Sequence, residues 1–260
     1  MVRAITTIVC SLLLLLSFSC SREDTGPQET IPGSGIVTFT AMTGQGETRS
    51  SQEGSFETGD AIGVFAIEPK TGVYWAVNNK YTYDGQKFKP EAEADNIIVT
   101  VGTDFDFYVY YPFKTGQTDI TGISHTAGNQ NEKAGWISAD FMTATYTDPI
   151  RDYTVPLNFK HRMSTVEVRI DRNDGVREAT MENVKRTSRF NLLTGGISTD
   201  ESKGNCTMYK YSEAGGTTVF RVTIPAQRLT TSSNYVSLTG TTPTVSYTHL
   251  RAHETRSNLV

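Results

Sequence analysis

The sequence predicts an all-β protein, and three observations support this fold class. Threonine occurs 38 times in the 260 residues, and aromatic residues make up 10% of the chain. Thr, Tyr and Phe fit the pleated, half-buried surface of a sheet better than a helix. Short runs of β-type residues also recur between clusters of Gly, Asn, Asp and Pro. The length allows one large β domain or two ordinary domains.

Residues 1–19 are typical of a secretory signal peptide. Their apolar run, which includes Leu12–Leu16, is too short to span a membrane and ends at Cys20. This ending resembles the lipobox of bacterial lipoproteins, so we predict that Cys20 carries the lipid anchor. The alternative is an ordinary signal peptide whose removal leaves Cys20 as an unpaired thiol. Residues 20–35 lack periodic apolar positions and are interpreted as a flexible tether.

Eight β-type runs fall in a first predicted domain, residues 36–172. The runs are Ile36–Ala41, Ala61–Ile67, Trp75–Tyr83, Ile97–Val101, Phe105–Tyr111, Phe141–Tyr146, Tyr153–Phe159 and Met163–Ile170. In the last run, Val166 and Val168 alternate with polar residues, which indicates a strand with one buried face. The run Phe105–Tyr111 carries aromatic residues at odd and even positions, which predicts a central strand with two packed faces.

The polar interval Asp171–Gly175 predicts a boundary, followed by a partial second domain over residues 173–244. Four further β-type runs belong to this part: Ser188–Leu193, Cys206–Tyr211, Thr217–Ile224 and Tyr235–Thr239. The segment Val176–Val184 is the exception, because its Glu, Ala, Met and Lys residues favour a short helix.

Residues 245–260 are predicted to be foreign to the gene. The stretch Val245–Thr255 is what one reading frame of a transposase-based sequencing adapter would encode. His249 and His253 lie in this stretch at the spacing of helical metal ligands. We exclude them from the search for sites, as one excludes an expression scar.

Elsewhere the sequence carries no signature of catalysis, because it has no nucleophile-elbow, paired-cysteine or metalloprotease motif. His125 and His161 have no second His or Cys near them in the sequence, and Cys206 is interpreted as a small packed hydrophobe. We therefore predict a non-catalytic protein with no cofactor and no metal site. The formal net charge of −4 gives no electrostatic footprint for nucleic acid.

Two groups of carboxylates are interpreted as solvated charges, not as acid–base pairs: Asp104 with Asp106, and Glu91 with Glu93 and Asp95. Trp75 and Trp136 could stack on sugar rings, but large aromatic residues more often fill a β core. We therefore expect both tryptophans to pack.

Six segments of the first domain, taken together, suggest a family. They are, in order, Phe56–Phe65, Asn79–Tyr81, Phe88–Pro90, Phe107–Phe113, Asp140–Met142 and Phe159–Met163. This ordered set resembles the fimbrillin family of Bacteroidota, and Phe190–Gly195 and Ile224–Gln227 are similar to segments of its second domain. The resemblance implies two tandem transthyretin-like Greek-key β-sandwich domains, here with the second truncated. It also implies a lipoprotein precursor at the outer membrane and cell surface that assembles with other fimbrial subunits.

Polymerising members of that family are cut after an Arg near the start of the first domain. The strand that is lost is then replaced by one from the next subunit, which is a form of β-augmentation. Here Arg49 and Ser50 follow the run Ile36–Ala41 and are the candidate processing site. The alternative function is a lipid-anchored glycan- or ligand-binding β-sandwich, which requires Trp75 and Trp136 to be exposed on one surface.

Overall fold

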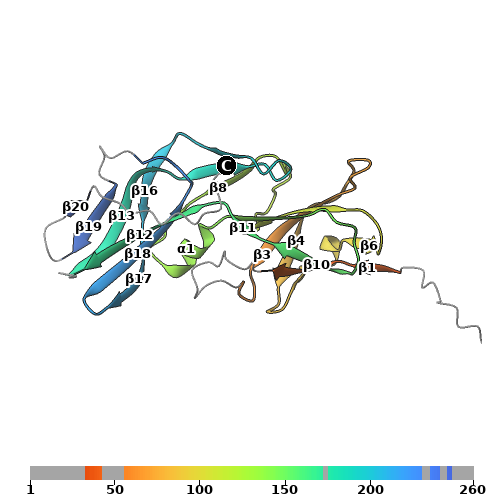
Figure 1. The fold of residues 1–260 in the computed structure, drawn as a ribbon, viewed down its shortest axis with the longest axis horizontal. Coiled ribbons are helices and arrows are strands. Elements are labelled where there is room, and N and C mark those ends of the chain that lie inside the picture. The colour runs from red at the N-terminus through yellow and green to blue at the C-terminus, as the bar shows by residue number, and fades with distance from the viewer. Residues whose placement is uncertain (1–32, 43–55, 172–174, 230–234, 241–244, 248–260) are drawn as a thin grey trace, which may run out of the picture. The chain divides into compact units, whose positions relative to one another are not determined.

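The structure is a computed structural model that describes residues 33–42, 56–171, 175–229, 235–240 and 245–247. These residues all belong to one compact unit that begins at Pro32. Their secondary structure is almost entirely β (Figure 1). The described part contains one α-helix, α1 (Lys133–Ser138), and one 3-10 turn, η1 (Glu93–Asp95). The predicted all-β class is therefore confirmed.

A first group of strands pairs in the order β10-β2-β5-β4-β3-β7-β9-β11. These strands are β2 (Thr38–Met42), β3 (Ala61–Ile67), β4 (Tyr74–Tyr83), β5 (Phe88–Pro90), β7 (Asp106–Tyr111), β9 (Met142–Tyr146), β10 (Thr154–Asn158) and β11 (Lys160–His161). Phe39 of β2 packs edge to face on Phe107 of β7, with 5.3 Å between ring centroids. Three strands separate these two residues in the pairing order, so the sheet folds over a shared core as in a sandwich.

Strands β3 and β7 lie at the centre of this sheet and bury both faces. Val64 and Val109 belong to one apolar core, whereas Phe65 and Tyr110 belong to another. The aromatic strand β7 pairs with β3 and β9, which confirms the central position predicted for it. Gly63 makes this packing possible, because a Cβ there would lie 2.3 Å from the Tyr110 ring.

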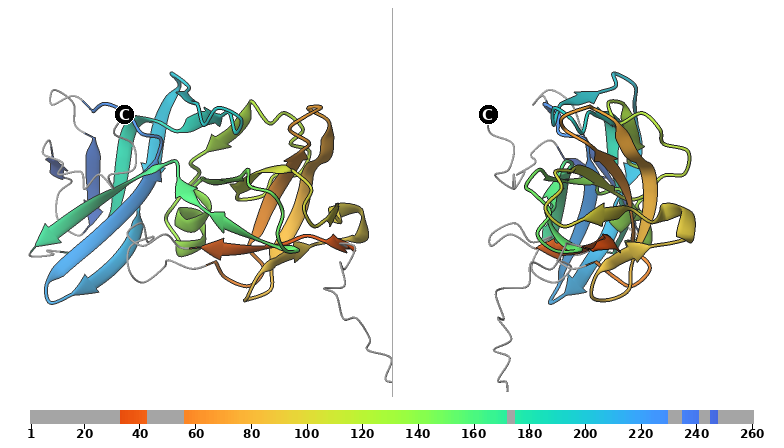
Figure 2. Two further views of the ribbon diagram at one scale, coloured as in Figure 1. Left: turned by 45° about the vertical axis from the view of Figure 1, so that its right-hand side comes forward. Right: turned by 90° about the vertical axis from the view of Figure 1, so that its right-hand side faces the viewer.

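A second group of strands forms two sheets, in the orders β12-β18-β17 and β16-β13-β19-β20. They are β12 (Ser164–Asp171), β13 (Val176–Lys185), β16 (Lys203–Thr207), β17 (Tyr209–Ala214), β18 (Thr217–Ile224), β19 (Val236–Gly240) and β20 (Val245–Tyr247). Figure 2 shows β17 and β18 side by side. Both sheets contribute to one core, for example through Val222 and Met181.

Strand β12 pairs with strands beyond the predicted domain boundary. Its residues pair antiparallel with β18 along the whole strand, from Ser164↔Ile224 to Asp171↔Thr217. The sequence alternation of β12 shows that one face is buried, and Val166 is indeed buried, but alternation does not identify the partner strand. Strand pairing thus groups β12 with the second set of strands, while the division at residue 172 stays a prediction.

The helix predicted over Val176–Val184 is wrong, since these residues form β13. Ala179, Met181 and Val184 are all fully buried. Ala179 and Met181 are two residues apart, whereas Met181 and Val184 are three apart. A β-bulge between Met181 and Val184, where Asn183 adopts φ 54°, accounts for the extra residue. Burial of an apolar face against a sheet outweighs the weak helix preference of individual Glu, Ala and Lys residues.

Two smaller sheets complete the fold. In one, β1 (Ser34–Ile36) pairs with β6 (Ile98–Thr100). In the other, β14 (Thr187–Phe190) pairs with both β15 (Ile197–Thr199) and β8 (Ile123–Thr126). The β8–β14 pair joins segments that are about sixty residues apart. In the segment predicted to be foreign, β20 pairs with β19, and the origin of that segment stays a prediction.

The side chain of Gln130 hydrogen bonds to the backbone of β18 beyond the point where β17 stops pairing with that strand. Pairing of β17 with β18 ends at Tyr209↔Arg221. Two residues further along β18, Thr223 N donates to Gln130 Oε1 and Gln130 Nε2 donates to Thr223 O, each at 2.7 Å. The Gln130 side chain is completely buried. It therefore satisfies a buried N–H and C=O as a neighbouring strand would.

Candidate functional sites

The predicted lipidation site Cys20 and the processing site Arg49–Ser50 lie outside the described residues. The structure does describe β2, the strand that a cut after Arg49 would separate from the rest of the chain. β2 pairs in parallel with β10 from Thr38↔Thr154 onward and pairs with β5 only at Phe39↔Phe88. Val37 and Phe39 are fully buried.

Cys206 and His125 are both core residues. Cys206 is 1% exposed, and burial raises the pKa of its thiol, so the packed role predicted for it is confirmed. His125 is 3% exposed, and its Nε2 lies 3.0 Å from Ala139 O. Its Nδ1 has no hydrogen-bond partner in the described part of the chain. Burial is the main cause that lowers the pKa of His125 to about 4.

Stability should therefore depend on pH through His125. In the unfolded chain His125 binds a proton as the pH falls below its ordinary pKa of 6.5. In the folded chain it does so only when the pH falls to about 4. The free energy of unfolding should thus fall by roughly 3 kcal/mol as the pH drops through this window. Urea unfolding at pH 7 and pH 4 measures the change, and His125→Leu should lose this part of it. Equal pH dependence in the two proteins would contradict the assignment.

His161 and Asp140 form a pair at the start of the strand ladder between β11 and β9. His161 Nδ1 lies 2.7 Å from Asp140 Oδ2, and both side chains are mostly buried. The pair joins two segments that are 21 residues apart. His125 and Cys206 contribute no atom to it. Within the described residues, no group of three or more His, Cys, Asp or Glu side chains could hold a metal ion.

In the part of the chain that the structure describes, four of the five carboxylates named from the sequence, all except Glu93, have local side-chain or backbone partners. Lys70 lies 3.1 Å from Asp104, and Lys80 lies 3.6 Å from Glu91. Asp95 accepts a hydrogen bond from the backbone N–H of Lys80 at 2.8 Å. Burial is the main cause that raises the pKa of Asp106, whose carboxylate hydrogen bonds with Tyr108. These contacts support loop and strand-end roles for the carboxylates.

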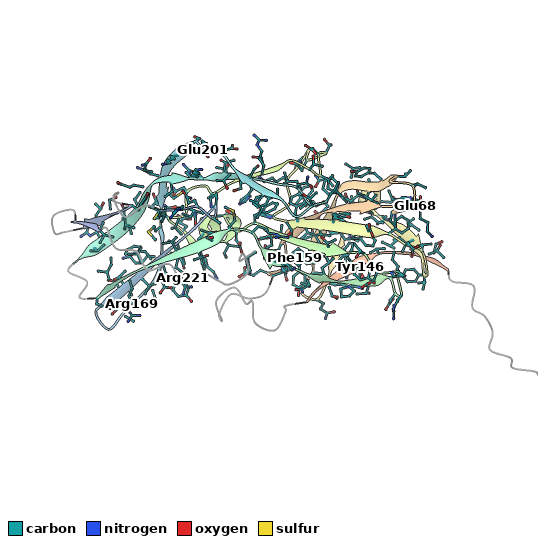
Figure 3. All side chains as sticks on the ribbon, turned by 45° about the horizontal axis from the view of Figure 1, so that its top comes forward. Glu68, Tyr146, Phe159, Arg169, Glu201 and Arg221 are labelled. Carbon is teal, nitrogen blue, oxygen red and sulfur yellow. The ribbon has the colours of Figure 1, made fainter. Side chains whose placement is uncertain are left out.

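The two tryptophans differ in exposure. Trp75 is 58% exposed and rests its edge on Phe105, with ring centroids 5.3 Å apart. Trp136 of α1 is 9% exposed and stacks on Tyr209 at 5.5 Å. The guanidinium of Arg221, labelled on β18 in Figure 3, lies 5.8 Å from the Trp136 ring. Trp136 therefore packs as predicted, whereas the buried position predicted for Trp75 is wrong. The two tryptophans do not form the shared exposed surface that the glycan-binding alternative requires.

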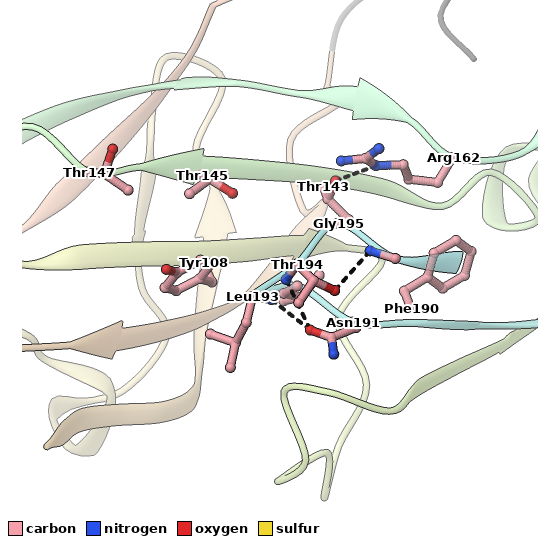
Figure 4. A pocket seen from close by; sticks show the side chains of 12 residues that line it. Tyr108, Thr143, Thr145, Thr147, Arg162, Phe190, Asn191, Leu193, Thr194 and Gly195 are labelled. Atoms are coloured by element: carbon pink, nitrogen blue, oxygen red, sulfur yellow. Dashed lines mark hydrogen bonds between the residues drawn. The ribbon is translucent and has the colours of Figure 1, made fainter. Parts of the chain in front are cut away.

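A pocket of about 310 Å³ was not predicted from the sequence. It lies between the face of β7 and β9 and the turn Asn191–Gly196 that joins β14 to β15 (Figure 4). Asn191 Oδ1 shapes this turn by accepting hydrogen bonds from the backbone N–H groups of Leu193 at 3.0 Å and Thr194 at 3.1 Å. Gly195 completes the turn at φ 70°.

Arg162 supplies the only charged side chain among the residues that line this pocket. Its Nε donates to Thr143 Oγ1 at 2.6 Å, and burial lowers the pKa of its guanidinium. The other lining side chains are hydroxyl, amide, aromatic and aliphatic groups. Sequence reasoning missed the pocket because its walls come from segments that strand order alone does not bring together.

The packed β-sheets define a β-sandwich protein, in which His125 and Cys206 are core residues and His161 pairs with Asp140. A model of the family described as fimbrillin-like matches residues 48–258, and the chain belongs to this family. Membership of this family supports a non-enzymatic role as a fimbrial or adhesion subunit. It also supports a location at the cell surface and assembly with other fimbrial subunits. In the described part of the chain, no helix is long and apolar enough to cross a membrane.

Solved structures share the fold. A candidate cell adhesion protein from Bacteroides ovatus is 16% identical, with a TM-score of 0.61, and the match covers 83% of this chain and 86% of that chain. One from Bacteroides uniformis is 20% identical, with a TM-score of 0.57 and coverage of 82% and 84%. One from Bacteroides thetaiotaomicron is 19% identical, with a TM-score of 0.52 and coverage of 82% and 84%. The comparison with curated proteins gives no match.

Proposed function

We propose that the chain is the lipid-anchored precursor of a fimbrial subunit that assembles by strand exchange and contributes to adhesion. In this proposal Cys20 carries the lipid that holds the precursor on the outer face of the outer membrane. A cut after Arg49 then separates the anchored segment, including β2, from the body of the subunit. A strand from the next subunit takes the place of β2.

The observation that carries the proposal is the packing of β2. Phe39 of β2 and Val37, which directly precedes the strand, are fully buried, and the ring centroids of Phe39 and Tyr81 lie 5.0 Å apart. Removal of the strand would expose apolar core residues and the backbone edge of β10 together. An exposed apolar groove beside an unpaired edge is a strong acceptor for another strand. The parallel β2–β10 pairing defines the register that an incoming strand would have to satisfy.

Limited trypsin digestion of the folded chain tests the exchange. We expect the first cut at Arg49, identified by mass spectrometry, followed by larger oligomers in size-exclusion chromatography with light scattering. Arg49→Gln is the matched control and should remain monomeric. A labelled peptide of residues 34–42 should bind the cut protein and block the oligomers, whereas the same peptide with Phe39→Asp should not bind. A cut monomer that retains its own residues 34–42 would refute strand exchange.

The anchor is tested separately in cells. Radiolabelled palmitate should be incorporated into the chain and be absent from the Cys20→Ala variant. External protease should digest the intact protein on whole cells. Labelling that persists in the variant would contradict lipidation at Cys20, and protection from protease would contradict surface exposure.

A further inference from the structure

We propose that the pocket beside Arg162 binds a single carboxylate-bearing sugar unit, whose carboxylate pairs with the Arg162 guanidinium. The proposal does not depend on strand exchange, because β2 contributes no residue to the pocket. It assigns a ligand class to a surface of this subunit that the assembly proposal leaves unused.

The first step of the argument is the unbalanced charge of Arg162. The guanidinium is half-buried, and its one hydrogen bond to a described side chain goes to the neutral hydroxyl of Thr143. No Asp or Glu is among the residues that line the pocket, and Asp106, which hydrogen bonds with Tyr108, is outside that set. A partly desolvated cation is stabilised by an anion, and the planar guanidinium fork fits a carboxylate.

The second step is the row of hydroxyl groups that leads away from Arg162. Thr143, Thr145 and Thr147 follow one another at alternate positions along β9 and just beyond it, so they share one face. Figure 4 shows their side chains along this strand. Thr145 also lies directly opposite Tyr108 in the β7–β9 ladder. Hydroxyl groups that both donate and accept suit the hydroxyl groups of a sugar ring.

The third step is the size and the apolar part of the pocket. Its volume of about 310 Å³ lies at the lower end of the range of roughly 300–1,000 Å³ typical of small-molecule sites. Such a space holds one sugar ring and not an extended peptide. Leu193 is 41% exposed and lines the pocket together with the half-buried ring of Tyr108. These side chains provide a surface for the apolar face of the ring.

Titration of the isotope-labelled full chain by NMR tests the ligand class. Glucuronate should shift backbone signals of residues 191–196 and bind at least about tenfold more tightly than glucose, its neutral counterpart, because charged hydrogen bonds are the stronger ones. Sodium sulfate and N-acetylglycine are the competing probes. Binding of glucose as tight as that of glucuronate would overturn the role of the carboxylate. Equal or tighter binding of sulfate or N-acetylglycine would overturn the assignment to a sugar.

Variants test the residues. Arg162→Gln should weaken glucuronate binding roughly ten- to a hundredfold, and Arg162→Lys should weaken it less, because the charge remains but the planar fork is lost. Thr145→Val keeps the side-chain shape at an exposed position and should weaken binding without changing the melting temperature. Arg169→Gln is the matched control, since Arg169 is exposed on β12 and does not line the pocket. Unchanged binding in both Arg162→Gln and Thr145→Val would refute the site.

Discussion

Replacing Gln130 with methionine should lower the free energy of unfolding by roughly 2–6 kcal/mol. The substitution keeps the length of the side chain but leaves the N–H and the C=O of Thr223 without their 2.7 Å partners. An unsatisfied buried polar group costs about 1–3 kcal/mol, and two groups are affected. The backbone of β18 does not need to move for this cost to appear, because methionine fills nearly the same volume.

Urea unfolding followed by circular dichroism measures the loss. Gln130→Glu should also destabilise the fold, because it removes the donor to Thr223 O and buries a carboxylate. Gln86→Ala is the control, since Gln86 is exposed and, among the described residues, hydrogen bonds only through its backbone N–H, which donates to Asp84. A Gln130→Met protein as stable as the Gln86→Ala protein would show that the two hydrogen bonds between Gln130 and Thr223 contribute nothing to stability.

Replacing Phe141 with alanine should cost about 3–5 kcal/mol, the range found for large aromatic residues in cores. Phe141 is fully buried and stacks on Phe190, with 4.1 Å between ring centroids. It also contacts the rings of Tyr110 at 5.8 Å and His125 at 5.2 Å. Loss of the ring removes these contacts and leaves a cavity that the surrounding rings fill only in part.

The matched variant is Phe141→Leu, which retains most of the buried apolar volume and should be less destabilised than Phe141→Ala. Denaturant unfolding of the unmodified protein, Phe141→Leu and Phe141→Ala measures how much each substitution lowers the free energy of unfolding. Because the His125 ring packs on Phe141, the alanine variant should also admit water to His125 and reduce the pH dependence of stability. A loss below about 0.5 kcal/mol for Phe141→Ala, the level of a surface substitution, would contradict its place in the core.

Local sequence pattern predicted the strands well where burial follows a simple period. Ala61–Ile67 was predicted with the bounds that β3 has, because its apolar residues stand between turn residues on both sides. β8 was missed because Ile123–Thr126 alternates only twice and contains His125, whose burial depends on a distant strand. β13 was predicted as a helix because its bulge breaks the two-residue period of buried positions that marks a strand.

The pocket and the Gln130 contact could not be predicted because both depend on pairings between distant segments. From the sequence alone Gln130 is an ordinary loop glutamine, because its hydrogen-bond partner Thr223 lies 93 residues away in β18. Likewise, Arg162 and the Asn191 turn face each other only after β14 has paired with β8. Sequence alternation reveals which side of a strand is buried, but it does not identify the strand that lies opposite.

The parallel pairing of β2 with β10 has a mechanical consequence. Thr38, at the start of β2, pairs with Thr154 at the start of β10, and the far ends meet at Met42 and Asn158. A pulling force applied to the chain ahead of β2 and resisted by the chain after β10 therefore acts at opposite ends of the pair. Such a load shears all the hydrogen bonds between the two strands at once instead of opening them one by one. The uncut protein should accordingly resist tension along the strands better than tension across them.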